Sequence, residues 1–266
     1  MSNRPIGIFD SGVGGLTVVK SLLERLPGES FVYYGDTAHV PYGSKSREEL
    51  FQYAHDIIAF LLHQQVKTIV VACGTHSSVT LPELEKSCPV PILGVVKPGA
   101  RAAVSATRCG KVGVIATQAT VNSGSYTKNI KDIDPSLDVY SAACARFVPL
   151  IEAGILSGPE TEQAIEEYVG PLLSQGIDTL VLGCTHYPFL APLISRCAGQ
   201  GLTLVDPACE TVEELSEILR KGDLLNDRPD RNQREFYVSG NDESFYIVGR
   251  MLLGDVIRKV HRVDLY

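Results

Sequence analysis

The feature that most constrains this chain is a stretch that occurs twice: an aliphatic run, a small residue, a cysteine and then a Thr-His pair. The second copy spans 179–188 (TLVLGCTHYP), and the first spans 68–76 (TIVVACGTH). In each copy the spacing of apolar residues changes after the histidine, which predicts a buried strand, a tight turn and an amphipathic helix. Cys73 and Cys184 are therefore expected just past parallel strands, at the edge where open α/β sheets bind ligands. A helix N-terminus there would also lower the pKa of a thiol from about 8.5.

The composition is typical of a globular protein. The 266 residues suffice for one large α/β domain or two smaller ones, with 21% charged and 44% hydrophobic residues. A net charge of −7 disfavours general nucleic-acid binding, which needs clustered Lys and Arg. It leaves room for a small anionic substrate, because local groups set the local potential.

Cysteine usage indicates the compartment. Seven cysteines are an odd number, and their spacing gives no compact disulfide framework. The first apolar run, 6–9, is too short for the core of a signal peptide, and no apolar run approaches the length of a membrane span. We therefore expect a cytoplasmic protein with free thiols and no membrane partner.

Strands and helices alternate along the whole chain, which predicts an α/β fold with mostly parallel sheets covered by helices on both faces. The duplicated cysteine stretch favours two similar lobes. We expect lobe A to comprise 1–97 and 208–266, with Cys73 and a loop at Asp10. Lobe B would comprise 98–207, with Cys184 and a loop at Thr117.

The first of these loops, 10–15 (DSGVGG), lies between a predicted strand and a predicted helix. Its glycines would expose backbone N–H groups to an anion. The spacing matches neither the dinucleotide fingerprint nor the P-loop, so we expect no nucleotide. A tight turn alone would explain the glycines. Asp10 followed by Ser11 at the strand's carboxyl edge favours function instead, because a carboxylate there can bind an ammonium group or act as a base.

The two repeated cysteines allow three interpretations. Free cysteine is among the most buried residue types, so both could simply be core thiols. Cys73, His76, Cys184 and His186 are all metal-ligand types, but their spacing is not that of a structural zinc site, and we expect no metal. The third interpretation is a pair of acid/base thiols that face each other across a cleft.

Paired thiols have a definite chemistry. Inverting a stereocentre without a cofactor requires removal of a proton from one face and delivery of a proton to the other. One thiolate and one thiol can do this, and they exchange roles in the reverse reaction. Positive helix ends and imidazoles would stabilise the charge that develops.

Other polar residues carry weaker signals. Thr117 and Thr120 follow a predicted strand and could hydrogen-bond a carboxylate, although a helix N-cap explains them equally well. Glu152 could support a catalytic group or lie on a solvated helix face. The remaining cysteines have no such context, and we expect them to be core or surface thiols: Cys88, Cys109, Cys144, Cys197 and Cys209. Four histidines receive no role: His39, His55, His63 and His261.

Five stretches together are similar to the motifs of the glutamate racemases, in the aspartate/glutamate racemase superfamily. They are 7–16 (GIFDSGVGGL), 36–43 with its Pro41-Tyr42-Gly43, Cys73, Ala116-Thr117 and 183–188 (GCTHYP). The resemblance implies a two-lobe α/β fold with the active site between the lobes. It implies interconversion of L- and D-glutamate without a cofactor, to supply D-glutamate for bacterial peptidoglycan, and a possible homodimer.

The resemblance also implies roles for individual residues. Cys73 and Cys184 would be the acid/base thiols, Asp10 and His186 would assist them, and Glu152 would lie behind His186. The implied substrate-binding residues are Asp10, Ser11, Tyr42, Gly43, Gly74 through its backbone N–H, Thr75, Thr117, Thr120, Thr185 and His186.

One departure concerns the residue after the first cysteine. The family usually has Cys-Asn-Thr where this chain has Cys73-Gly74-Thr75. The lost side-chain hydrogen bond would cost roughly 1.5–3 kcal/mol, with water as a partial replacement. Gly74 therefore leaves open the alternative that the chain is a racemase for another amino acid, such as aspartate. The fold alone would also be compatible with a non-catalytic regulatory protein. His76, which stands where the family often has a small residue, could cap the helix or add a donor near Cys73.

Overall fold

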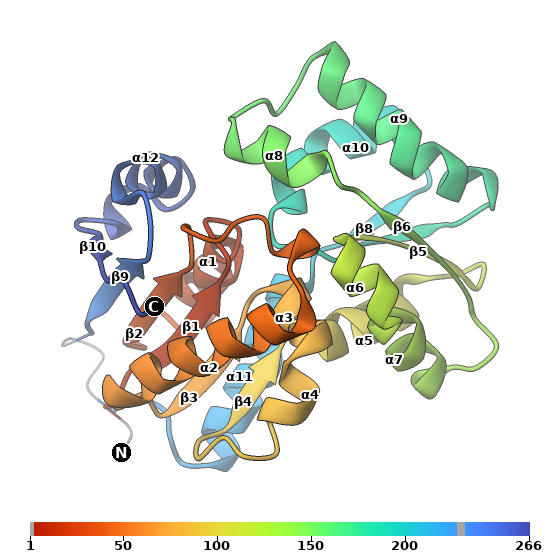
Figure 1. Cartoon of the computed structure of the whole chain (residues 1–266). Helices are drawn as coiled ribbons and strands as arrows, with labels where there is room; N and C mark the ends of the chain where they lie inside the picture. The colour runs from red at the N-terminus through yellow and green to blue at the C-terminus, as the bar shows by residue number, and fades with distance from the viewer. Residues whose placement is uncertain (1–2, 228–231) are drawn as a thin grey trace.

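The computed structural model describes residues 3–227 and 232–266, and in this part of the chain two parallel sheets lie in two lobes (Figure 1). The larger sheet has the strand order β10-β9-β2-β1-β3-β4, and the smaller has β6-β5-β7-β8. Every pair of neighbouring strands runs parallel, which confirms the expected α/β class. The strands are β1 (Ile6–Asp10), β2 (Phe31–Gly35), β3 (Thr68–Val71), β4 (Ile92–Gly94), β5 (Lys111–Ala116), β6 (Asp138–Ala143), β7 (Thr179–Leu182), β8 (Thr203–Val205), β9 (Arg234–Val238) and β10 (His261–Arg262).

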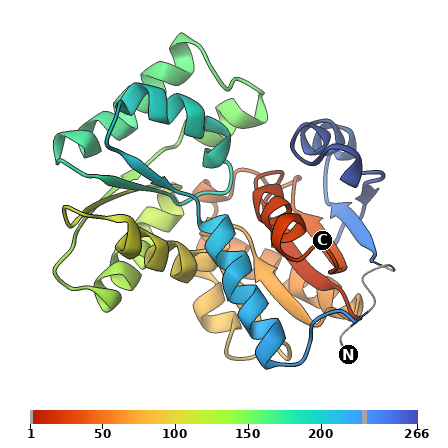
Figure 2. The same ribbon diagram turned by 180° about the vertical axis from the view of Figure 1, so that it is seen from behind.

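Helices flank both sheets, as Figures 1 and 2 show from opposite sides. We keep the name lobe A for the six-stranded sheet with its helices and lobe B for the four-stranded sheet with its helices. The α-helices are α1 (Leu16–Arg25), α2 (Arg47–His63), α3 (Gly74–Val79), α4 (Leu81–Leu84), α5 (Val96–Ala106), α6 (Gln118–Ser123), α7 (Ser125–Ile133), α8 (Phe147–Glu152), α9 (Pro159–Ser174), α10 (Ala191–Ala198), α11 (Pro207–Lys221) and α12 (Asp242–Leu253).

Two connections join the lobes. Helix α5 leads from β4 into β5, and β8 leads into α11, which packs against both α1 and α5 (Figure 2). Strand β9 then pairs with β2, so the C-terminal residues return to the six-stranded sheet.

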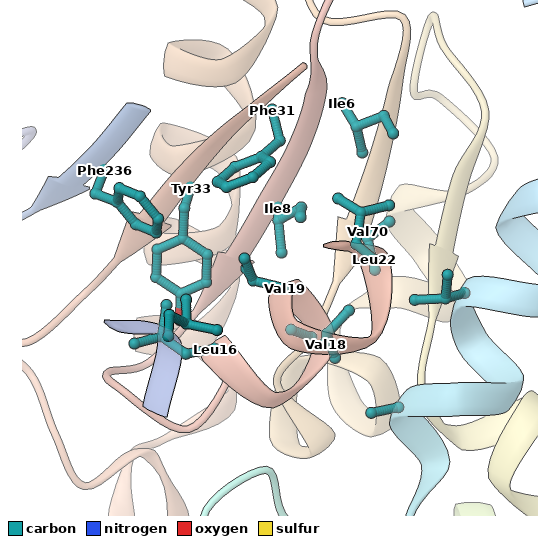
Figure 3. Close-up of a cluster of buried hydrophobic side chains, with 14 of the residues drawn as sticks. Ile6, Ile8, Leu16, Val18, Val19, Leu22, Phe31, Tyr33, Val70 and Phe236 are labelled. Carbon is teal, nitrogen blue, oxygen red and sulfur yellow. The ribbon is translucent and has the colours of Figure 1, made fainter. Parts of the chain in front are cut away.

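The core of lobe A fixes the glycine-rich loop after β1. Ile8 and Tyr33 on the sheet and Leu16 and Val19 on α1 are fully buried against each other (Figure 3). The Tyr33 hydroxyl donates a 2.7 Å hydrogen bond to the carbonyl oxygen of Gly12. This hydrogen bond therefore anchors the glycine-rich loop to the packed core.

The two cysteine stretches form fully buried strands β3 and β7, as expected, but the helices after them are shorter than the apolar spacing predicts. After Cys73 the helix is interrupted at Thr80 and divides into α3 and α4. After Cys184 the chain makes a 3₁₀ turn, η2 (Tyr187–Leu190), before α10 begins. Pro82 and Pro188 explain this, since proline lacks the N–H that an α-helix interior needs.

The sequence suggests a helix at Glu152 only as one alternative and does not give the bounds of α8, because it is a single short segment that contains Pro149. This helix matters because its last residue is Glu152. Among the described residues, no helix is both long enough and apolar enough to cross a lipid bilayer.

Candidate active site

A cavity of about 330 Å³ lies where the turn that contains Cys73 in lobe A meets the turn that contains Cys184 in lobe B; we call these two turns the cysteine turns. Parallel strands β1, β3, β5 and β7 all direct their carboxyl ends toward it, which is where α/β sheets bind ligands. Its walls include ten residues expected from the sequence: Ser11, Tyr42, Gly43, Cys73, Gly74, Thr75, Thr117, Cys184, Thr185 and His186. Asp10, Thr120 and Glu152 are not on the wall but hydrogen-bond to residues that are.

Cys73 follows β3 and is buried at the N-terminus of α3. Burial raises the pKa of its thiol, and the negative charge of Asp10 raises it further, while the backbone N–H groups of His76 and Thr75 act in the opposite direction. The expectation that the helix N-terminus lowers the pKa is therefore wrong for Cys73, because desolvation outweighs the helix end. This environment favours the protonated thiol.

Cys184 faces an imidazole. Its Sγ lies 3.8 Å from Nδ1 of His186, and Nε2 of His186 lies 2.7 Å from Oε1 of Glu152. Burial would lower the pKa of His186, but the hydrogen bonds to Cys184 and Glu152 outweigh it and raise that pKa well above its usual value. The resulting imidazolium stabilises negative charge on the Cys184 sulfur.

Asp10 is a fully buried carboxylate that joins the two lobes. The backbone N–H groups of Gly12 and Gly15 donate to its Oδ2 at 3.1 and 2.9 Å. The Thr185 hydroxyl, from lobe B, donates to its Oδ1 at 3.2 Å. Asp10 therefore fixes the glycine-rich loop, holds Thr185 and places a negative charge near Cys73.

Three threonines form a hydroxyl chain across the cleft. Oγ1 of Thr75 in lobe A lies 3.0 Å from Oγ1 of Thr117 in lobe B, and the Thr117 hydroxyl donates to Oγ1 of Thr120 at 3.0 Å. Thr117 also caps α6 by accepting the backbone N–H of Thr120. The N-cap interpretation is confirmed for Thr117, which also lines the cavity, and a hydrogen bond to a substrate carboxylate stays a prediction.

Tyr42 forms another part of the cavity wall, and a hydrogen bond to a buried carboxylate fixes its side chain. Its hydroxyl donates to Oδ2 of the fully buried Asp36, which also accepts hydrogen bonds from Ser239 and Tyr266. Gly43 follows Tyr42 in the 3₁₀ turn η1 (Tyr42–Ser44) and lies against Thr117 of the other lobe.

Gly74 lies where the two cysteine turns touch. A Cβ atom built on Gly74 would be 2.3 Å from the carbonyl oxygen of Gly183, the residue before Cys184. No side chain fits at this position in the observed arrangement.

His76 does not cap the helix. Its ring is fully buried, with Nδ1 3.2 Å from the Thr80 hydroxyl, and it makes edge contacts with Phe9 and Tyr42. Burial lowers its pKa to about 3, so the ring is neutral. Its contribution to Cys73 comes through its backbone N–H.

Cys144, which the sequence analysis left without a role, also lines the cavity. It is a buried core thiol, as expected, but it directly follows β6, which pairs with β5 at the same sheet edge. Its strand-end position was the signal that could have identified it. Gln118, at the start of α6, is a second wall residue that the sequence analysis did not single out.

The zinc interpretation finds no support in the arrangement of ligand-type side chains. Within residues 3–227 and 232–266, no three or more His, Cys, Asp or Glu side chains are grouped so that they could hold a metal ion.

Comparison with known proteins identifies the family. A sequence model of the Asp/Glu/Hydantoin racemase family matches residues 6–215. This chain belongs to that family. It is 44% identical to a glutamate racemase from Geobacter metallireducens, over 98% of this chain and 97% of that protein. It is 46% identical to a glutamate racemase from Thermoanaerobacter pseudethanolicus, over 100% of this chain and 99% of that protein.

Solved structures agree with this assignment. The crystal structure of a glutamate racemase from Francisella tularensis in complex with D-glutamate superimposes with a TM-score of 0.92 at 37% identity, covering 100% of this chain and 99% of that one. The resemblance to the glutamate racemases that the motifs indicate is thereby confirmed over the full length.

Proposed function

We propose that this chain is a glutamate racemase, which interconverts L- and D-glutamate without a cofactor. The observation that carries the proposal is the presence of Cys73 and Cys184 on one cavity, each at the end of a parallel strand from a different lobe. Relatives named glutamate racemase, 44–47% identical over nearly the whole chain, support the substrate. The product would supply bacterial peptidoglycan synthesis.

The two thiols act on opposite faces of the substrate α-carbon. One thiolate removes the α-proton and becomes a thiol, while the opposing thiol donates its proton to the other face and becomes a thiolate. No proton is gained or lost overall, and the reverse reaction exchanges the two roles. Binding between the lobes also keeps water from the carbanionic transition state, so the fixed dipoles around it act at low dielectric.

The two thiols have different electrostatic environments. The His186 imidazolium lies against the Cys184 sulfur, and Glu152 holds that imidazolium, so negative charge that develops on this sulfur is stabilised. Cys73 is the resting thiol because burial and the Asp10 charge raise its pKa. The two proton positions exchange with each turnover.

The substrate is held by hydroxyl and backbone groups. Thr75 and Thr117 present hydroxyls to one carboxylate, with the N–H of Gly74 beside them. Ser11, Gly43, Thr185 and His186 complete the wall, and the buried Asp10 offsets the substrate ammonium charge.

Three further features belong to this proposal. The cytoplasm is its location, because both thiols must remain reduced. Lobe A comprises 1–97 and 208–266, and lobe B comprises 98–207. A homodimer is expected from the family resemblance, and light scattering of the purified chain measures it.

The test is isotope exchange in D₂O without added cofactor. The chain is incubated separately with L- and D-glutamate, optical rotation is followed, and NMR locates deuterium at the α-carbon. Inversion with deuterium mainly in the product enantiomer is expected from two bases that each hold one proton. Aspartate in parallel tests the alternative substrate; exchange of aspartate alone, or of neither amino acid, contradicts the proposal.

A further inference from the structure

The backbone of the two lobes comes into close contact beside the two cysteines, at Gly74 and Gly183. The hydrogen that a side chain would replace on Gly74 points at the Gly183 carbonyl oxygen, and a Cβ there would be 2.3 Å from it. Real Cβ atoms essentially never approach another heavy atom within 3.0 Å. The obstructing atom is main chain at the end of the buried strand β7, so no flexible side chain can move aside.

We propose that Gly74 is a positioning residue that sets the distance between the catalytic thiols by letting the two cysteine turns touch. This inference rests on the proposed two-thiol racemisation and adds a structural determinant to it. Gly74 follows Cys73, and Gly183 precedes Cys184, so the Gly74–Gly183 contact lies one residue away from each cysteine.

Other contacts across the cleft also join the two lobes. The Thr185 hydroxyl bonds to Asp10, Thr75 lies 3.0 Å from Thr117, and the Ser125 hydroxyl donates to Ser78 at 2.8 Å. Helix α3, which carries Thr75, packs beside helix α6, which begins directly after Thr117 (Figure 1). A side chain at residue 74 would push the two lobes apart like a wedge and would therefore strain all of these contacts at once.

The size of the wedge gives the size of the effect. A methyl group at residue 74 needs about 0.7 Å of separation to move from 2.3 Å to the 3.0 Å limit. A misplacement of about 1 Å in a reacting geometry costs on the order of 10²-fold in rate. Inversion needs both thiols within reach of the α-carbon, whereas removal and return of a proton on one face needs only one. Opening the lobes should therefore reduce inversion more than one-face exchange.

The experiment compares full-length wild type, Gly74→Ala and Gly74→Asn with glutamate in D₂O. The measured quantities are the inversion rate and the ratio of deuterium in recovered substrate to deuterium in product. We expect inversion by Gly74→Ala to fall on the order of 10²-fold and the ratio to rise about tenfold. Gly74→Asn should be at least as impaired, although it adds an amide that could bind substrate.

Two further variants separate positioning from folding. Gly170→Ala adds the same methyl inside α9, where it meets only the mobile end of the Glu166 side chain at 3.0 Å, and it should behave as wild type. Gly43→Ala adds a milder wedge, 3.0 Å from Cβ of Thr117 across the cleft, and should shift the ratio in the same direction by less. Loss of folded protein lowers both rates equally and leaves the ratio unchanged, so the ratio reports geometry.

The outcomes are distinct. Gly74→Ala or Gly74→Asn with wild-type inversion overturns the inference, as does a fall in inversion with an unchanged ratio. If Gly74→Ala yields no folded protein, an unchanged ratio in Gly43→Ala overturns it. Failure of the wild type to racemise glutamate removes the proposed function itself, and the inference with it.

Discussion

Replacing Glu152 by glutamine tests how the His186 imidazolium is maintained. The Glu152 carboxylate lies 2.7 Å from Nε2 of a histidine whose side chain is 1% exposed. A hydrogen bond between charged groups contributes about 1.5–3 kcal/mol. Its loss therefore lowers the pKa of His186. Desolvation, the largest influence on this histidine, then acts with less opposition.

The consequence is a shift of the alkaline limb of the pH–activity profile. Imidazolium is present below the pKa of His186 and is lost as the pH rises through it, so a lower pKa moves this limb to lower pH. We expect this shift in Glu152→Gln. At the alkaline end kcat would fall roughly 10–100-fold, with recovery toward neutral pH.

The assay follows optical rotation during conversion of D-glutamate across the pH range. Glu167→Gln is the matched control, because Glu167 forms an exposed ion pair with Arg146 on the same lobe. An alkaline limb that is the same in Glu152→Gln and wild type would refute the role assigned to the Glu152–His186 pair.

Two further changes test binding and stability. Thr117→Val removes the hydroxyl that faces Thr75 and caps α6, and we expect KM for glutamate to rise about 2–12-fold from the loss of a hydrogen bond, with kcat changed less; an unchanged KM contradicts a substrate contact. The side chains of Lys67 and Glu29 are 1% and 3% exposed, so Lys67→Met leaves the buried Glu29 without its cationic partner. We expect the free energy of unfolding to fall by about 3–5 kcal/mol, which thermal denaturation would show as a decrease of roughly 6–20 °C in Tm. Lys221→Met, in an exposed pair with Glu217, should leave Tm within about 2 °C, and a similar loss in both variants would contradict the burial argument.

The sequence was a good guide wherever local pattern decides structure. The aliphatic runs before Cys73 and Cys184 predict β3 and β7, because strand formation here depends on near neighbours. The bounds of helix α8 were not predicted, because six residues with an internal proline give too little periodicity.

Features that depend on tertiary contact could not be read from the sequence. A position at a helix N-terminus suggests a low thiol pKa for Cys73, but burial and the proximity of Asp10 raise that pKa, and neither is a local feature of the sequence. The contact between Gly74 and Gly183 joins residues more than a hundred positions apart, so only the folded arrangement shows that a side chain has no room.

The central claim is that each thiol serves one face of the substrate, and single thiol variants test it most directly. Cys73→Ser and Cys184→Ser are each incubated in water with L- and with D-glutamate that carry deuterium at the α-carbon, and loss of label is followed by NMR. We predict that neither variant inverts glutamate at an appreciable rate, and that each removes label from only one enantiomer, a different one in each variant. Wild-type inversion by either variant, or loss of label from the same enantiomer in both, would contradict the account.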